Sequence, residues 1–264
     1  MELRLLNRDD CCVLAEAIGE SPFTITAVHN LLRGRCRAWS IGEPACFAAA
    51  VIQMNDLPEE PEGYGRPELI WQALQQAQGY DCVNVSWDNG PALVDVMRRQ
   101  AGIDPHLYPD LYHVLTKAAA RYECPHVRLL TLADAPLMRR MGDLDLGHDG
   151  YDTPEAAVTE GVFAAGLVDG RIVAAVKATS IGRRYANIGA ETHLAYRRRG
   201  ICTAAASLVA RQLQERGLVP VWSAGSGNAA SLRVAAKLGF ESCGKKVYVV
   251  KDPQRLAKRL ADSP

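Results

Sequence analysis

The stretch Tyr196-Arg-Arg-Arg-Gly-Ile-Cys-Thr-Ala-Ala-Ala206 decides the fold that we expect for this chain. It follows a strand-like segment, residues 185–194, and opens a run of small residues that predicts a helix over 201–216. A strand that turns straight into a helix exposes backbone N–H groups at the helix N-terminus, where the helix dipole adds positive potential. Gly200 lets the backbone approach a ligand closely, and the three arginines before it add charge. The turn therefore predicts an anion site, and a pyrophosphate is the anion that it fits best.

A second run, Asn228-Ala-Ala-Ser-Leu-Arg-Val-Ala-Ala-Lys-Leu-Gly-Phe240, predicts a helix that Asn228 caps and Gly239 ends. Together the two runs resemble the two cofactor-side motifs of the GNAT superfamily of acetyl-CoA-dependent N-acetyltransferases. The resemblance covers residues 128–251 well. It implies an α/β fold with a mixed, largely antiparallel sheet flanked by helices, and acetyl-CoA as co-substrate.

The first motif of the family is a basic residue or Gln, two free positions, Gly, one free position, and Gly or Ala. This chain has Arg197 and Gly200 in place but Cys202 at the last position. The resemblance implies that N–H groups of the turn bind the pyrophosphate of acetyl-CoA and that the strand end pairs with the acetyl and pantetheine amides. The implied cofactor residues are His193, Leu194, Ala195, Arg199, Gly200, Ile201, Cys202, Thr203, Ala204, Asn228 and Ser231. Asn228 has a simpler alternative, a helix N-cap alone.

Acetyl transfer to an amine needs a neutral nitrogen, so we look for a base near the end of the 185–194 strand. Glu191 is the first candidate, because partial burial would raise its pKa toward the working range. The alternative is a solvent-facing Glu or one paired with an arginine. His193 is the second candidate because imidazole titrates near neutrality, and a structural role is its alternative.

Two positions weaken the case for catalysis. Many relatives in the family carry a Tyr seven residues after the Asn, where it acts as general acid toward the CoA thiolate, but this chain has Ala235. Cys202 as a nucleophile has no paired His in the sequence. The function predicted is direct transfer of an acetyl group from acetyl-CoA to a primary amine of a small molecule or peptide. The alternative is a non-catalytic acyl-CoA-binding or sensor protein that kept the fold.

Composition limits the partners. The 264 residues carry 30 Lys and Arg against 30 Asp and Glu, so we expect neither nucleic acid nor a membrane surface. Residues 1–120 hold 9 basic and 16 acidic residues, and residues 121–264 hold 21 and 14. The acidic first half favours a cationic amine as the acceptor. The eight scattered cysteines form no C-x-x-C pair and the N-terminus lacks a signal-peptide pattern, which favours a cytoplasmic protein without a metal site.

The two halves of the chain resemble each other, which predicts two tandem similar domains. Arg4-Leu5-Leu6 with Asp10 returns as Arg128-Leu129-Leu130 with Asp134. We expect a degenerate GNAT-like or cap domain over 1–120, a GNAT-like catalytic domain over 125–251, and a tail over 252–264. Residues 57–65, rich in Pro and Glu, stand where the second half has its arginine turn, so the first half is not expected to bind a nucleotide. A homodimer is possible.

Overall fold

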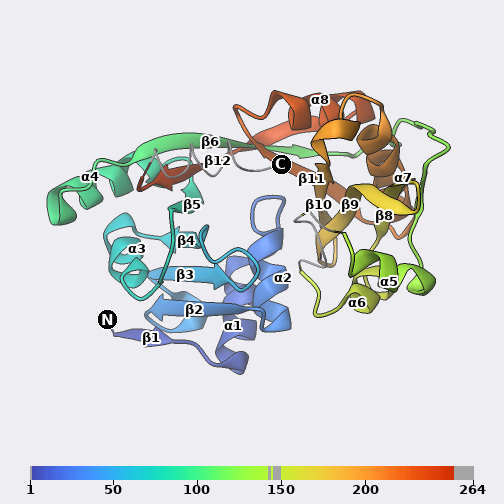
Figure 1. Cartoon of the computed structure of the whole chain (residues 1–264). Coiled ribbons are helices and arrows are strands. Elements are labelled where there is room, and N and C mark those ends of the chain that lie inside the picture. Colours follow the sequence, from blue (N-terminus) through green and yellow to red (C-terminus); the bar gives the residue numbers. More distant parts are fainter. Residues whose placement is uncertain (1, 142–143, 145–149, 253–264) are drawn as a thin grey trace. The chain divides into compact units, whose positions relative to one another are not determined.

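The computed structural model of the chain describes residues 2–141, 144 and 150–252. The chain divides into two compact units, whose helices and strands are labelled in Figure 1. The first unit is built from the chain up to Leu111 together with the C-terminal part from Gly244 onward. The second unit runs from Tyr112 to Cys243. The predicted tail 252–264 lies, apart from Asp252, outside the described residues.

The first unit is a sheet with helices on both faces. Its strands follow the order β1-β2-β3-β4-β5-β12, in which only β4 and β5 pair in parallel. The elements are β1 (Leu3–Leu5), α1 (Arg8–Ile18), α2 (Ile25–Arg33), β2 (Cys36–Ile41), β3 (Ala49–Met54), β4 (Glu62–Gly65), α3 (Pro67–Leu74), β5 (Cys82–Ser86), α4 (Asn89–Ala101) and β12 (Glu241–Val250). A further strand, β6 (His106–Val114), leads out of this unit.

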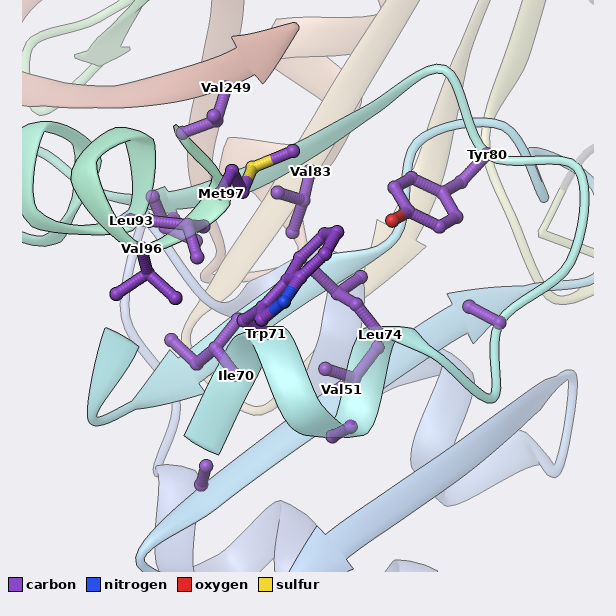
Figure 2. Packing of buried hydrophobic residues seen from close by; sticks show 14 of the residues in the cluster. Val51, Ile70, Trp71, Leu74, Tyr80, Val83, Leu93, Val96, Met97 and Val249 are labelled. Atoms are coloured by element: carbon purple, nitrogen blue, oxygen red, sulfur yellow. The ribbon is translucent and has the colours of Figure 1, made fainter. Parts of the chain in front are cut away.

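Two hydrophobic clusters build the core of the first unit. Val51 of β3 packs with α3 and α4, whereas its neighbour Ile52 packs with α1 and α2. Successive strand residues point to opposite faces, so the two helix pairs cover opposite faces of the sheet. Figure 2 shows Trp71 of α3 at the centre of the first cluster, to which β12 contributes Val249.

The second unit repeats this plan. Its strands follow the order β11-β10-β9-β8-β7, and only β10 and β11 pair in parallel. The elements are β7 (Val127–Leu129), α5 (Ala135–Met138), α6 (Pro154–Thr159), β8 (Phe163–Val168), β9 (Arg171–Ile181), β10 (Tyr185–Thr192), α7 (Ile201–Glu215), β11 (Val219–Gly225) and α8 (Ala229–Leu238). The hydrophobic cluster beneath α7 and α8 includes Val176 of β9, and the cluster beneath α5 and α6 includes Ala175. The two helix pairs therefore lie on opposite faces here as well.

A matching ion pair opens both repeats. Arg128 of β7 donates two hydrogen bonds to Asp134, at 2.7 and 2.6 Å, and Asp134 closes a capping box with Thr131. The guanidinium holds the pKa of the Asp134 carboxyl well below its ordinary value. The equivalent residues in the first repeat are Arg4, Asn7 and Asp10, where Asn7 and Asp10 form the capping box of α1. The structure thus confirms the repeat that the sequence predicted.

Local sequence signals explain several elements of the second half. The β8–β9 hairpin turns at Asp169 and Gly170, both with positive φ, as the Asp-Gly pair predicts. Thr153 caps α6 by accepting a hydrogen bond from Ala156 N–H. A 3-10 turn over Leu132–Asp134 is followed by α5, which ends at Met138.

The first half holds two elements that its sequence did not reveal. The helix α2 was missed, and so was β4, which occupies residues 62–65 of the segment compared above with the arginine turn. The structural counterpart of that turn is therefore the step from Gly65 to Pro67, at the start of α3.

Candidate functional site

The site begins where β10 and β11 stop pairing. The two strands pair in parallel at three positions, the last of which joins Asn187 to Val221. A bulge falls at Asn187 and Ile188, after which β10 continues beside β9 as far as Thr192. In the described part of the chain, β11 continues to Gly225 without further pairing to β10. The carboxyl ends of the two strands thus separate, and α7 and α8 each begin after one of these ends.

The N-terminus of α7 is built to receive an anion. The turn before it has Arg198 at φ 63° and the N-cap Gly200 at φ 77°. No side chain caps the helix, and its first turn holds no acidic residue. The first intrahelical bond here is donated by the N–H of Ala204 to the carbonyl of Gly200, at 3.0 Å. The N–H groups that precede Ala204 are those that a helix leaves for a ligand, and the helix dipole makes their surroundings positive.

His193 is held by its local contacts. Its backbone N–H donates to the Val173 carbonyl at 3.0 Å, and its Nδ1 accepts from the N–H of Ala195 at 3.3 Å. The ring meets the edge of Tyr196, with centroids 5.8 Å apart. A His whose Nδ1 accepts a hydrogen bond carries its proton on Nε2 when neutral, so neither nitrogen is a ready base. This geometry favours the structural alternative for His193.

Glu191 faces the side of the sheet covered by α5 and α6. It pairs with Ala175 of β9, which belongs to the cluster beneath those helices, and directly paired residues share a face. Its side chain is partly buried. The fully buried Lys177 pairs with Gly189, on the same face and one diagonal step from Glu191.

Cys202 and Thr192 meet on the opposite side of β10. Burial raises the pKa of the Cys202 thiol. The thiol therefore stays protonated at neutral pH. A nucleophilic Cys202 is not supported by these surroundings.

The start of α8 combines capping with core packing. The side-chain oxygen of Asn228 accepts the N–H of Ser231 at 3.0 Å, so the capping role is realised. The Ser231 hydroxyl accepts the indole N–H of Trp222 at 2.9 Å. Ala235 has no exposed surface and lies in the core cluster beneath α7 and α8. The sequence of α8 contains no Tyr that could serve as the general acid that the family resemblance implies.

A hollow of about 310 Å³ lies beside the N-terminus of α7. Three of its residues, Arg199, Gly200 and Thr203, are among the predicted cofactor residues, whereas Lys237 and the segment 122–125 are not. The sequence of that segment has no strand or core pattern. The one available signal was Ser207, a polar residue on the buried face of a small-residue helix.

In the first unit the equivalent opening is closed. β4 and β5 pair in parallel at Glu62 and Asn84 alone, but a Cβ added to the next residue, Gly63, would lie 2.8 Å from Ile70. The side chain of Asn89, at the start of α4, donates to the Gly65 carbonyl at 2.8 Å. This bond ties α4 to the turn before α3.

The helix start in the first unit is also unsuited to an anion. α3 begins with Pro67, which has no N–H to offer, and its first turn holds Glu68. Gly65 sits against backbone, since an added Cβ would lie 2.2 Å from the carbonyl oxygen of Ala48.

Among the described residues, no group of three His, Cys, Asp or Glu side chains is suited to hold a metal ion. All eight cysteines are free thiols. No helix in the described ranges combines the length and apolar character that crossing a membrane requires.

Known proteins share the fold of this chain. Residues 148–248 match the sequence model of the GNAT acetyltransferase family. A GCN5-related N-acetyltransferase-like protein from Streptococcus suis has a similar structure, with a TM-score of 0.66 at 18% identity over 92% of this chain and 98% of that one. A Drosophila protein gives 0.64 at 14% identity, covering 94% and 98%. No curated protein matches the chain in sequence.

A tandem GNAT protein from the clavulanic acid biosynthesis pathway is also similar, with a TM-score of 0.55 at 14% identity over 96% of this chain and 99% of that one. The chain is thus a tandem protein of the GNAT fold. Its second repeat resembles the GNAT acetyltransferases in sequence, and this resemblance supports acyl transfer as the general activity.

Proposed function

We propose that the protein transfers an acetyl group from acetyl-CoA directly to a primary amine of a small molecule or peptide. The observation that carries the proposal is the uncapped N-terminus of α7, which lies at the end of β10 where that strand parts from β11. A thioester bound there supplies the activated acetyl group. Everything else in the reaction is a task for the residues of this chain.

The first task is to hold the co-substrate. The N–H groups of Arg199, Gly200, Ile201, Cys202 and Thr203 precede the first intrahelical bond and suit a pyrophosphate. The backbone of His193, Leu194 and Ala195 continues the strand end, and we assign it to the acetyl and pantetheine amides. Asn228 keeps its amide N–H₂ for the pantetheine arm while its oxygen caps α8.

Ser231 contributes differently from the prediction. Because its hydroxyl accepts the Trp222 indole N–H, we assign it to positioning Asn228 and the start of α8. The N–H of Ala204 is engaged within the helix, so its part in anion binding is electrostatic only.

The second task is to deprotonate the amine. We assign it to Glu191, which is partly buried on the face opposite α7 and would accept a proton from the attacking nitrogen or through one water. General base catalysis of this kind contributes about 10²- to 10⁴-fold in rate. The leaving thiolate takes its proton from solvent, because Ala235 offers none.

The acceptor is proposed to be a cationic amine such as an amino sugar, a polyamine or an amino acid derivative. The excess of acidic residues in 1–120 supports this choice through long-range attraction. We further propose that the protein acts in the cytoplasm, where its free thiols remain reduced, and that neither nucleic acid nor membrane is its partner.

One observation favours a second function, acyl-CoA binding without catalysis. Ala235 is buried where many relatives have their general acid. Release of CoA thiol across a panel of amines separates the two functions. Transfer predicts release with at least one amine, and Glu191→Gln then lowers kcat about 10²-fold or more without changing acetyl-CoA affinity. Binding of acetyl-CoA without release for any amine would establish the second function.

The control for Glu191→Gln is Glu215→Gln. Glu215 is the last residue of α7, and its carboxylate accepts a hydrogen bond from the side-chain amide of Gln212. It therefore lies at the opposite end of α7 from the proposed acetyl-CoA site. This substitution makes the same change in charge and is expected to leave kcat unchanged. Equal losses of kcat in the two variants would show that Glu191 is not the general base.

A further inference from the structure

The hollow beside α7 is a feature whose lining goes beyond the turn itself. Its lining includes Arg199 and Gly200 from the turn, Thr203 from the start of α7, and Lys237 near the end of α8. The segment 122–125 forms the remaining wall. All of these residues belong to the second unit.

The hollow presents two cations. Among the described residues, neither Arg199 nor Lys237 forms an ion pair with a carboxylate. The Arg199 guanidinium lies over the Tyr196 ring, 5.1 Å from its centroid, which limits its rotamers while leaving its N–H donors available. Glu123 also lines the hollow, but its carboxylate accepts from Arg121 at 2.7 Å. The cations therefore dominate the local charge.

The Thr203 hydroxyl adds a neutral donor. Thr203 lines the hollow and is 7% exposed as a residue, and no hydrogen bond of its hydroxyl is found within the part of the chain that the structure describes. The hydroxyl is not among the buried side-chain atoms without a partner, so it is open to solvent or to a ligand in the hollow. The same spot receives the positive end of the α7 dipole.

The segment 122–125 is held in place by hydrogen bonds. The Tyr122 hydroxyl donates to the Lys237 carbonyl at 3.2 Å, and the Tyr122 N–H donates to the Ser207 hydroxyl at 3.2 Å. Ser207 in turn donates to the Ala120 carbonyl at 2.7 Å. These bonds join the connecting segment to both helices, so the hollow is preorganised.

We propose that this hollow binds the 3′-phosphate of the CoA nucleotide, with Lys237 as the residue that selects CoA over dephospho-CoA. The inference rests on the proposed function. A phosphate monoester carries about −1.5 to −2 charge at pH 7 and offers three acceptor oxygens, which match Arg199, Lys237 and the Thr203 hydroxyl. Lys237 and Asn228 lie at opposite ends of α8. A substitution at Lys237 therefore affects binding of the nucleotide part of the ligand without changing the residue assigned to the pantetheine arm.

Calorimetric titration of the full chain with acetyl-CoA and with acetyl-dephospho-CoA tests the proposal. The wild-type protein is expected to bind acetyl-CoA about tenfold more tightly or better, as loss of a charge-assisted hydrogen bond implies. Lys237→Gln should remove most of this preference, because it should lower the affinity for acetyl-CoA and leave the affinity for acetyl-dephospho-CoA unchanged. Raising the salt concentration should narrow the wild-type preference as well.

Arg233→Gln is the matched control, because Arg233 is exposed one turn earlier on α8 and does not line the hollow. It should retain the full preference. Equal wild-type affinity for the two ligands, an undiminished preference in Lys237→Gln, or the same loss in both variants would overturn the proposal. Absence of wild-type binding to either ligand would refute the proposed function itself, a result distinct from these.

Discussion

Glu191 and His193 stand two residues apart at the end of β10, yet their surroundings suit them to different tasks. His193 is engaged through its backbone, its Nδ1 and its ring face. Glu191 lies partly buried on the face that holds the buried Lys177. The sequence could name both residues as candidates because carboxylate and imidazole side chains commonly serve as general bases. It could not rank them, since the ranking depends on hydrogen bonds made by Ala195 and Val173.

The Asp134 cluster gives a prediction at the same scale. Its pKa is lowered in the fold, first by the hydrogen bond from Arg128, so its ionised form stabilises the native state above the ordinary carboxyl range and that contribution fades as pH falls below about 4. We expect Asp134→Asn to lower the free energy of unfolding by about 1–2 kcal/mol at pH 7, since Arg128 is half exposed and solvent screens the pair.

Urea unfolding at pH 7 and at pH 3 measures the effect of Asp134→Asn. The difference in unfolding free energy between wild type and Asp134→Asn should be smaller at pH 3. At that pH the carboxyl group takes up protons in the unfolded chain while it stays ionised in the native state, so the ion pair stabilises the fold less. Glu155→Gln is the control, because that carboxylate pairs with Arg139 at the surface and should matter much less. A gap between wild type and Asp134→Asn that widens in acid would contradict the account.

Among the elements, α7 shows what a sequence can and cannot predict. Small residues and Gly200 indicate both the helix and its anion-binding start, and the strand before it was also predicted. The wall of the hollow was not, because hydrogen bonds such as Tyr122 to Lys237 join segments that lie far apart in the sequence. α2 was missed as well, since the β-branched residues Ile25, Thr26 and Val28 weaken its helical signal.

Two glycines of α7 provide a matched pair for testing its N-terminus. Gly200 before the helix and Gly217 after it both have φ 77°, and an added Cβ would meet no neighbour within 4 Å at either position. Alanine at either should destabilise the fold by a similar amount, about 1 kcal/mol, because positive φ strains an L-residue. Only Gly200→Ala should also lower the affinity for acetyl-CoA, by about tenfold, because it disturbs the turn that presents the N–H groups.

Melting temperature and calorimetric titration together check the glycine pair. If the two variants have similar melting temperatures but only Gly200→Ala has a lower affinity for acetyl-CoA, the turn has a role in binding. If Gly217→Ala lowered the affinity for acetyl-CoA as much as Gly200→Ala, the loss of affinity would come from lower stability, and the turn would have no special part in binding.

The whole molecule divides differently from its sequence repeats. β12 is the last strand of the second repeat, but its residues Lys246 to Val250 pair with β5 of the first unit. Val247 and Val249 are fully buried in the cluster with Trp71, and Lys246 forms a buried ion pair with Glu62. No sequence pattern indicates this placement, because an alternating apolar strand fits either sheet edge equally well.

This exchange predicts the behaviour of fragments. Residues 1–120 alone would leave β5 without its antiparallel partner β12 and Glu62 without its cation Lys246, so we expect no cooperative unfolding transition from this fragment. Adding a peptide of residues 241–252 should restore a transition, measured by circular dichroism during urea titration. A fragment 1–120 that unfolds cooperatively without the peptide would show that β12 is dispensable to the first unit.

The central claim is that only the second repeat of this tandem protein binds acetyl-CoA, at the start of α7. Calorimetric titration of the full chain with acetyl-CoA tests it most directly. The account predicts one site per chain, weakened about tenfold by Gly200→Ala and unchanged by Asn89→Ala, which alters only the closed opening of the first unit. Two sites per chain, no binding at millimolar acetyl-CoA, or an affinity indifferent to Gly200→Ala would contradict it.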